Sequence, residues 1–138
     1  MKAIKVVFDT NVIYSGLLSK KGVSYKLLKL IPKGIFKLSL SVPLLLEYET
    51  ILLRNLRKLN LTKVDIDDFL DYLCSVSDLT KIYYLWRPIL KDPYDDHILE
   101  LAVASSSKYI ITYNIKDFTE SKYFNIKTIT PDEFIKIL

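Results

Sequence analysis

The sequence predicts an α/β fold with a mostly parallel central sheet flanked by helices. Short apolar segments rich in β-branched residues alternate with longer segments of helical periodicity, a pattern typical of strand–helix–strand units. The first segment, residues 3–8, is apolar almost throughout, as expected for a central strand that is buried on both faces. A length of 138 residues, of which 50% are hydrophobic, fits one domain spanning residues 1–138.

Capping residues and helix breakers set the boundaries of the elements. Ser41, Thr62 and Thr130 are of the types that begin helices, whereas Pro32 and Gly34 stop one. Alternation of apolar and polar residues predicts one strand with a single buried face. The expected elements are a strand at 3–8, helices at 12–18 and 23–31, the alternating strand at 35–40, helices at 42–59 and 62–76, a strand at 81–86, a loop at 88–92, a helix at 95–106, strands at 109–112 and 126–129, and a helix from 131.

Composition limits the setting in which the protein works. One cysteine, Cys74, excludes an internal disulfide and fits a reducing compartment, and its apolar neighbours place it in the expected core. The N-terminus lacks a signal-peptide pattern and no apolar run is long enough to span a membrane, so we expect a cytoplasmic protein. The net charge of +4 is compatible with a polyanionic partner.

Four segments far apart in the sequence bring acidic side chains toward one edge of the predicted sheet. Ligands of open parallel sheets bind beyond the carboxyl ends of the strands, and helices that follow strands begin at the same edge. Each residue alone has an ordinary explanation as a turn, cap or surface residue, but together their repulsion requires a compensating cation. The residues are Asp9 after the first strand, Glu47 in the helix after the second, Asp92, Asp95 and Asp96 at the start of another helix, and Asn114 and Asp117 after strand 109–112.

A hard divalent cation, Mg²⁺ or Mn²⁺, meets that requirement because both ions prefer oxygen ligands. Two such ions about 3.5–4 Å apart can activate a water and stabilise the leaving oxygen of a phosphodiester. The chain has no cysteine–histidine spacing for zinc, no glycine-rich phosphate loop, and only one histidine for triad chemistry. That residue, His97, is more simply interpreted as a surface or hydrogen-bonded histidine than as a catalytic group.

Basic residues follow Glu47 along the expected helix 42–59. Arg54, Arg57 and Lys58 are spaced i, i+3, i+4, so a continuous helix presents them on one face. They are candidates for binding the RNA phosphate backbone, with a solvated helix face as the alternative. Glu47 itself has two structural alternatives, exposure to solvent or an ion pair with a basic residue such as Arg54.

Four stretches resemble, in order and spacing, the motifs of the PIN-domain nucleases over residues 5–134: VVFDTNVIYSGLL, LLLEYE, DPYDDHILELAVASSSKYIIT and TYNIKDF. The sequence is most similar to the VapC-like group, the toxin components of prokaryotic toxin–antitoxin pairs. The resemblance implies a PIN-like three-layer α/β/α fold and a metal-dependent endoribonuclease that cleaves single-stranded RNA. The four acidic positions of the family match Asp9, Glu47, Asp96 and Asp117.

The resemblance also implies supporting polar residues. Asn114 matches a position that is Asp or Asn in relatives, which makes it a further metal-ligand candidate, and Asn11 or Thr112 would support metal-bound water. The motif does not fix the choice between Asp95 and Asp96, and Asp92 is a third candidate at that helix start. The carboxylates of the pocket predict Mg²⁺ or Mn²⁺ as the cofactor.

The expected partners are single-stranded or structured RNA and a small antitoxin protein, with a homodimer as one assembly and no membrane. Two alternative functions stay open, a non-catalytic PIN-like RNA-binding module and a DNA or RNA nuclease that works in RNA processing without an antitoxin. Receiver domains and haloacid-dehalogenase-like phosphatases fit poorly. They need a second acidic residue close to Asp9, where this chain has Thr10 and Asn11.

Overall fold

A five-stranded sheet forms the centre of the computed structural model, which describes residues 3–82 and 95–138. Its strands are β1 (Ile4–Phe8), β2 (Phe36–Leu40), β3 (Asp78–Leu79), β4 (Tyr109–Ile111) and β5 (Lys127–Ile129). They lie in the order β3-β2-β1-β4-β5, and every neighbouring pair is parallel. The expected parallel sheet with a central first strand is confirmed.

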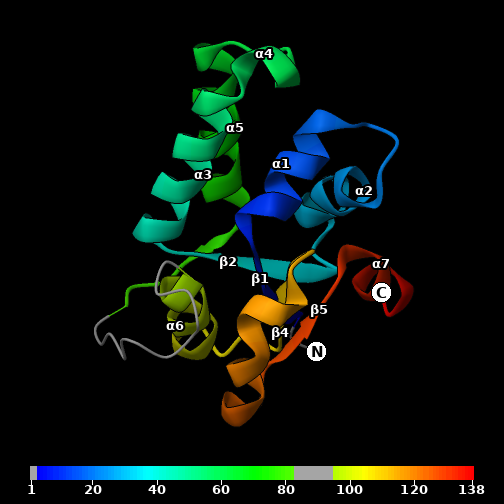
Figure 1. Ribbon diagram of the computed structural model, residues 1–138, viewed down its shortest axis with the longest axis vertical. Helices are drawn as coiled ribbons and strands as arrows, with labels where there is room; N and C mark the ends of the chain where they lie inside the picture. The colour runs from blue at the N-terminus through cyan, green and yellow to red at the C-terminus, as the bar shows by residue number, and fades with distance from the viewer. Residues whose placement is uncertain (1–2, 83–94) are drawn as a thin grey trace.

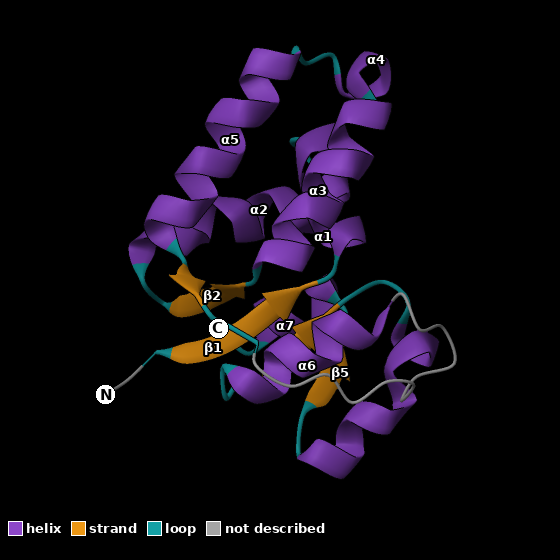
Figure 2. Cartoon of the chain, turned by 90° about the vertical axis from the view of Figure 1, so that its left-hand side faces the viewer, coloured by secondary structure: helices purple, strands orange, loops and turns teal. Residues whose placement is uncertain are grey.

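Helices connect the strands and cover both faces of the sheet (Figure 1). The α-helices are α1 (Thr10–Leu18), α2 (Val23–Leu30), α3 (Val42–Arg54), α4 (Leu56–Leu59), α5 (Lys63–Val76), α6 (Asp96–Ala104) and α7 (Pro131–Lys136), and two 3-10 segments are η1 (Ile31–Lys33) and η3 (Ile115–Phe124). Figure 2 shows α1, α2, α3 and α5 on one side of the sheet and α6 on the other, which confirms the three-layer α/β/α arrangement. Among the described residues, no helix is both long and apolar enough to cross a membrane.

Burial on both faces of the sheet explains why the sequence of β1 is mostly apolar. Val6, Val7 and Phe8 are fully buried although successive residues of a strand point to opposite faces, because helices cover both faces. The Phe8 ring lies 5.7 Å from that of Phe36 in β2, and Phe36 contacts Phe134 of α7 edge to face at 5.1 Å. Each such buried ring stabilises the fold by roughly 1.5–3 kcal/mol relative to exposure.

The chain changes direction across the sheet between β1 and β4. From β1 it proceeds through β2 to β3 on one side, whereas β4 and β5 extend the other side. The backbone N–H of Asp9 donates to the carbonyl of Ile111 at 2.9 Å, so the two strands end together. Open parallel sheets bind ligands at such a switch point, beyond the strand ends. Asp9 and Thr112 both lie there.

The expected single helix over 42–59 is wrong, because it divides into α3 and α4 at Asn55. Asn55 leaves helical geometry with φ −122° and ψ 24°, and its side chain donates to the carbonyl of Ile51 at 2.7 Å. The shared helical face expected for the three basic residues is therefore wrong as well. Arg54 ends α3, whereas Arg57 and Lys58 lie on α4.

Two further expectations differ from the structure. Lys81 and Ile82 are not in a strand, and the third strand of the sheet is the short β3, which ends at Leu79. The rest of the predicted strand 81–86 and the predicted loop 88–92 lie outside the described residues. Cys74 is exposed rather than in the core, because α5 turns Ile66 and Leu73 inward, two turns apart on one face.

Candidate active site

Asp9 is held rigidly at the end of β1, where it is the N-cap of α1. Its Oδ1 accepts a hydrogen bond of 2.8 Å from the backbone N–H of Thr10, and its Oδ2 accepts one of 2.7 Å from the hydroxyl of Thr112. The residue is only 8% exposed. The carboxylate is thus fixed from two chain segments that are brought together by the pairing of β1 with β4.

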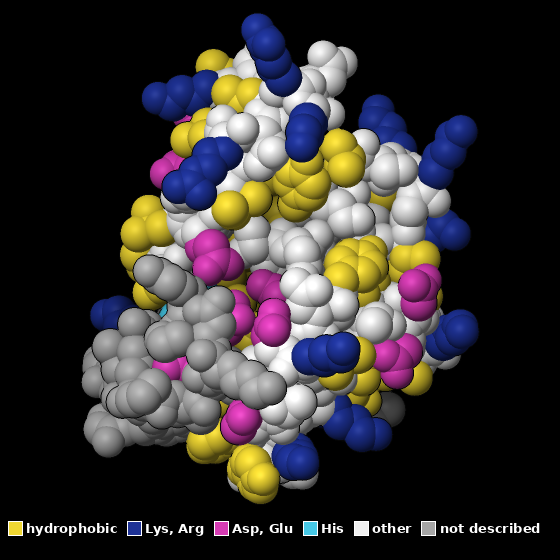
Figure 3. Space-filling view, in the orientation of Figure 1, with side chains coloured by type: hydrophobic (Ala, Val, Ile, Leu, Met, Phe, Trp, Pro, Cys, Tyr) yellow, Lys and Arg dark blue, Asp and Glu magenta, His cyan; other side chains and the backbone are white. Residues whose placement is uncertain are grey.

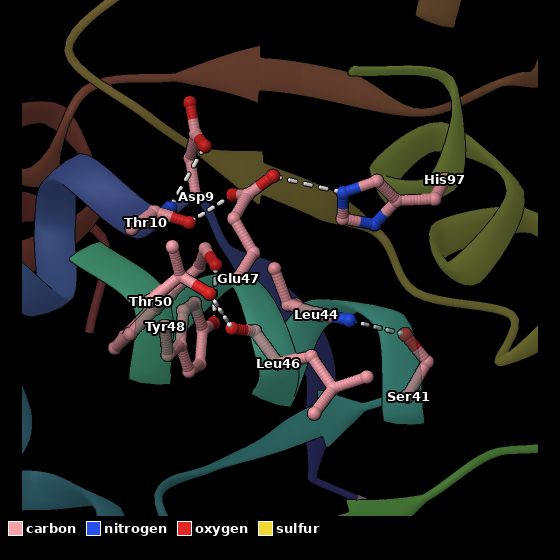
Figure 4. A network of polar contacts seen from close by, with 10 residues as sticks. Asp9, Thr10, Ser41, Leu44, Leu46, Glu47, Tyr48, Thr50 and His97 are labelled. Carbon is pink, nitrogen blue, oxygen red and sulfur yellow. Dashed lines mark hydrogen bonds and ion pairs between the residues drawn. The ribbon is translucent and has the colours of Figure 1, made fainter. Parts of the chain in front are cut away.

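Glu47 projects from α3 toward the same place, and two polar side chains hold it (Figure 4). The hydroxyl of Thr10 donates to Oε2 of Glu47, and Nε2 of His97 lies 3.0 Å from Oε1. Thr10 therefore links the two carboxylates, through its backbone to Asp9 and through its hydroxyl to Glu47. The partner of Glu47 is His97 rather than Arg54.

The pKa values of the two carboxylates are shifted in opposite directions. Burial raises the pKa of Asp9 above its usual value; hydrogen bonds from Thr112 and Thr10 oppose this, and the nearby charges of Glu47 and Asp117 add to it. Burial also acts to raise the pKa of Glu47, but the hydrogen bonds from His97 and Thr10 and the charge of His97 outweigh it and lower that pKa. Since burial is the largest cause for Asp9, a cation beside this carboxylate would favour its charged form.

A polar network behind Asp9 centres on the buried hydroxyl of Thr112. While donating to Asp9, this hydroxyl accepts from the backbone N–H of Asn114 at 3.0 Å and from the side-chain amide of Asn11 at 3.2 Å. The side-chain oxygen Oδ1 of Asn11 in turn accepts from the backbone N–H of Tyr113 at 3.3 Å. The start of α1 and the turn after β4 are thereby fixed to each other.

The carboxylates open into a cavity of about 920 Å³ bounded by α1, α3, the start of α6 and the turn after β4. Figure 3 shows acidic side chains gathered near the middle of this face, with basic side chains nearer the α4 end. The residues predicted from the sequence that line the cavity are Asp9, Asn11, Glu47, Arg54, Asp95, Asn114 and Asp117.

Four of the predicted site residues are described but do not line the cavity, and one of these, Thr112, donates to Asp9 without lining the cavity itself. Asp96, which the family match favoured, is fully buried, whereas its neighbour Asp95 faces the cavity. Arg57 and Lys58 belong to α4 and are exposed elsewhere on the surface. Asp92 lies outside the described residues, so its role as a ligand stays a prediction.

A sequence model of the PIN domain matches residues 5–116 of the chain. The chain belongs to the PIN domain family. The fold of this PIN domain is similar to the crystal structure of VapBC2 from Rickettsia felis bound to a DNA fragment from their promoter, with a TM-score of 0.63 at 17% identity over 92% of this chain and 98% of that one. No curated protein sequence matches it.

The donor set of this PIN domain fits a hard cation. Carboxylate oxygens of Asp9, Glu47, Asp95 and Asp117 and the amide of Asn114 are the oxygen donors that Mg²⁺ and Mn²⁺ prefer. Within 3–82 and 95–138, no three His, Cys, Asp or Glu side chains are grouped closely enough to hold one ion between them. Mg²⁺ commonly uses one or two carboxylates and keeps several waters, so a mostly hydrated ion suits the arrangement.

Sequence reasoning included Thr112 among the supporting residues but missed other residues that hold the carboxylates and α3 in place. Thr10 is visible in the sequence only as part of the Asp-Thr-Asn turn. His97 is a hydrogen-bonded histidine, one of the two expected alternatives, but the sequence did not indicate that its partner is Glu47. Tyr48, next to Glu47, is fully buried and its hydroxyl donates to the carbonyl of Phe8, which fixes α3 on β1. The signal for Tyr48 was its hydroxyl within an otherwise apolar helix face, since a buried hydroxyl requires a partner.

Proposed function

We propose that this PIN domain is a metal-dependent endoribonuclease that hydrolyses phosphodiester bonds of single-stranded RNA. The observation that carries the proposal is the pairing of Asp9 and Glu47 through Thr10 at the floor of an open cavity that Asp117 also lines. Within residues 3–82 and 95–138, no lysine or arginine forms an ion pair with Asp9, Glu47 or Asp117. The repulsion between such carboxylates is costly for the apo fold, and an active site that binds cations explains why they are there.

Each residue has a role in the proposed site. Asp9, Glu47 and Asp117 would hold the metal, with Asp95 as the contribution of the α6 start because it faces the cavity and Asp96 does not. Thr112 orients Asp9, and His97 orients Glu47. When bound, Mg²⁺ or Mn²⁺ would supply the positive charge that offsets these carboxylates and stabilises the phosphodiester transition state.

The test is cleavage of unpaired RNA by the purified protein. We expect cleavage in Mg²⁺ or Mn²⁺, none in EDTA, and none from the Asp9→Asn variant in any of these buffers. Binding of RNA by wild type without cleavage in either metal would favour the non-catalytic RNA-binding module. Cleavage of DNA with equal efficiency would favour a general nuclease instead.

We propose further that the protein is the toxin of a toxin–antitoxin pair. Support comes from the VapC-like sequence motifs and from the similarity of the fold to VapBC2 of Rickettsia felis, which was solved bound to DNA from its promoter. An acidic cavity is most simply blocked by an arginine of a partner chain, whose planar fork pairs two carboxylate oxygens.

The test of the toxin–antitoxin pair is co-expression with an adjacent small gene. Purification as one complex, with cleavage restored when the partner's inserted arginine is changed to alanine, would support the pair; a free, active enzyme that its host tolerates would contradict it.

A further inference from the structure

The cavity continues past the carboxylates along α3. Glu47, Ile51 and Arg54 all line it and are spaced i, i+4, i+7, so they lie on one face of the helix. Seven residues of α-helix separate Glu47 from Arg54 by about 10 Å. Tyr14 of α1 lines the cavity as well. The cavity therefore has an acidic end and an arginine-bearing end, separated by about two helical turns.

The arginine end carries a cation available for a ligand. Within residues 3–82 and 95–138, the ion pairs of the structure join Lys5 and Lys37 to Asp78 and His97 to Glu47, and Arg54 is in none of them. Arg54 is exposed at the rim, so its guanidinium meets the cavity without prior desolvation. A planar guanidinium pairs with two oxygens of a phosphate at once.

The cavity also offers an aromatic side chain, Tyr14 of α1, and an aliphatic one, Ile51, which lies between Glu47 and Arg54 on α3. Tyr14 and Ile51 are both half-buried, and each presents part of its surface to the cavity. An aromatic ring beside a cationic group is the combination that binds single-stranded nucleic acid, in which bases stack on rings while the backbone follows the charge. Bases that are paired in a duplex are stacked on their neighbours and are not free to stack on a side chain in this way.

We propose that the cavity binds successive nucleotides of an unpaired RNA strand, with Arg54 on a phosphate that flanks the scissile one and Tyr14 stacked on the intervening base. The proposal rests on the proposed nuclease function, since it takes the carboxylate end as the place of the scissile phosphate. It assigns phosphate binding to Arg54 and not to Arg57 or Lys58, which do not line the cavity. It also makes Tyr14 a determinant of the preference for single strands.

Binding is measured apart from cleavage, by fluorescence anisotropy of a short fluorescein-labelled RNA strand in EDTA. Arg54→Gln is expected to weaken binding about fivefold. It should also reduce the steepness with which the logarithm of the association constant falls with the logarithm of the salt concentration by about 0.7, the contribution of one phosphate contact on a single strand. Arg57→Gln is the matched control, since it removes the same charge from a residue outside the cavity, and a change below about twofold is expected. Equal losses for the two variants, or none for either, would overturn the proposal.

Tyr14→Leu and Tyr14→Phe test the stacking contact, with urea unfolding to show that both variants fold. Leu is expected to weaken binding of the single strand about fivefold or more and Phe to retain it, whereas the same strand annealed to its complement binds weakly to all three proteins. Equal binding by wild type and Tyr14→Leu would overturn the role of Tyr14.

Cleavage and binding together distinguish this inference from the proposed nuclease function. Asp9-dependent cleavage with no effect of Arg54→Gln on binding overturns this inference alone. Arg54-dependent binding without any cleavage would support the phosphate contact of Arg54 and contradict the nuclease.

Discussion

Nε2 of His97 lies 3.0 Å from Oε1 of Glu47, and this contact ties the first turn of α6 to the second turn of α3. The two side chains are 10% and 29% exposed, so the pair is largely shielded from water. His97 is the first residue after Asp96, and its ring reaches the carboxylate that Thr10 holds from the other side. The contact therefore joins two of the four cavity walls.

Replacing His97 by Leu is expected to destabilise the protein and to slow RNA cleavage. Glu47 would lose a hydrogen-bond partner at a largely buried position, which costs roughly 1–3 kcal/mol in the free energy of unfolding. His97→Gln restores a side-chain N–H donor and is expected to recover most of the loss. Urea unfolding in EDTA measures the stability, and the same losses in a Glu47→Gln background would show that the two residues do not interact.

Asp9→Asn is expected to abolish cleavage while the fold is retained. Removing the charge relieves the repulsion from Glu47 and Asp117, but an amide matches the donors around Oδ2 less well than a carboxylate. The two effects oppose each other, so the free energy of unfolding should change by no more than about 1 kcal/mol. Asp132→Asn, on the first turn of the distant α7, is the control and is expected to cleave as wild type does. Full cleavage by Asp9→Asn would remove Asp9 from the site.

The stability difference between wild type and Asp9→Asn is expected to depend on pH. Because the folded-state pKa of Asp9 is raised, its protonated form is favoured in the folded protein. The stability that Asp9 contributes is thus fully present below the unfolded-state pKa of about 3.9 and is lost as pH rises through the folded-state pKa. Wild type should gain on the variant as pH falls through that window in EDTA. A difference that is flat with pH would contradict a raised pKa.

Much of the fold was predictable because each element carries its own local signal. The buried β1 reads as an apolar run, and Thr62 and Thr130 both form the capping boxes that their sequences suggest. The break at Asn55 was not predictable, since the helical periodicity continues across it and only the packed structure shows the side chain bonding to Ile51.

For the candidate site, the strand-end rule predicted the edge of the sheet but not the partners. Asp9, Glu47 and Asp117 line one cavity, as expected of acidic residues at parallel strand ends. Which of Asp95 and Asp96 faces the cavity depends on a rotation of about 100° per residue at a helix start. No sequence signal resolves that rotation when both residues are aspartate.

Mn²⁺ is expected to raise the melting temperature, and EDTA to reverse the rise. An ion that binds only the folded state at a hundredfold excess over its Kd stabilises by about 2.7 kcal/mol. Asp95→Asn should reduce the shift more than Asp96→Asn, because only Asp95 lines the cavity. An equal shift in an Asp9→Asn/Asp117→Asn variant would mean that the ion binds elsewhere.

A side chain at Gly16 is expected to overpack the contact between α1 and α2. A Cβ at this position would lie 2.5 Å from Cδ1 of Leu28 and 3.2 Å from the carbonyl of Ser24. Gly16→Ala should therefore cost roughly 1–3 kcal/mol in overpacking, more than the gain of up to about 1 kcal/mol in helix propensity. Gly22→Ala is the control, because its nearest atom, the carbonyl of Ser19, is 3.8 Å away. Equal unfolding midpoints for the two variants would refute the packing argument.

The hydroxyl that fixes Asp9 belongs to Thr112, 103 residues farther along the chain. During synthesis the ribosome therefore releases Asp9 and Glu47 long before β4 exists to pair with β1 and before Asp117 has been made. A nascent chain that ends before β4 carries Asp9 and Glu47 but has neither the fixed carboxylate nor the closed cavity. For the proposed ribonuclease, the order of translation itself delays activity, because the site cannot form until the ribosome has passed the codons for β4 and Asp117.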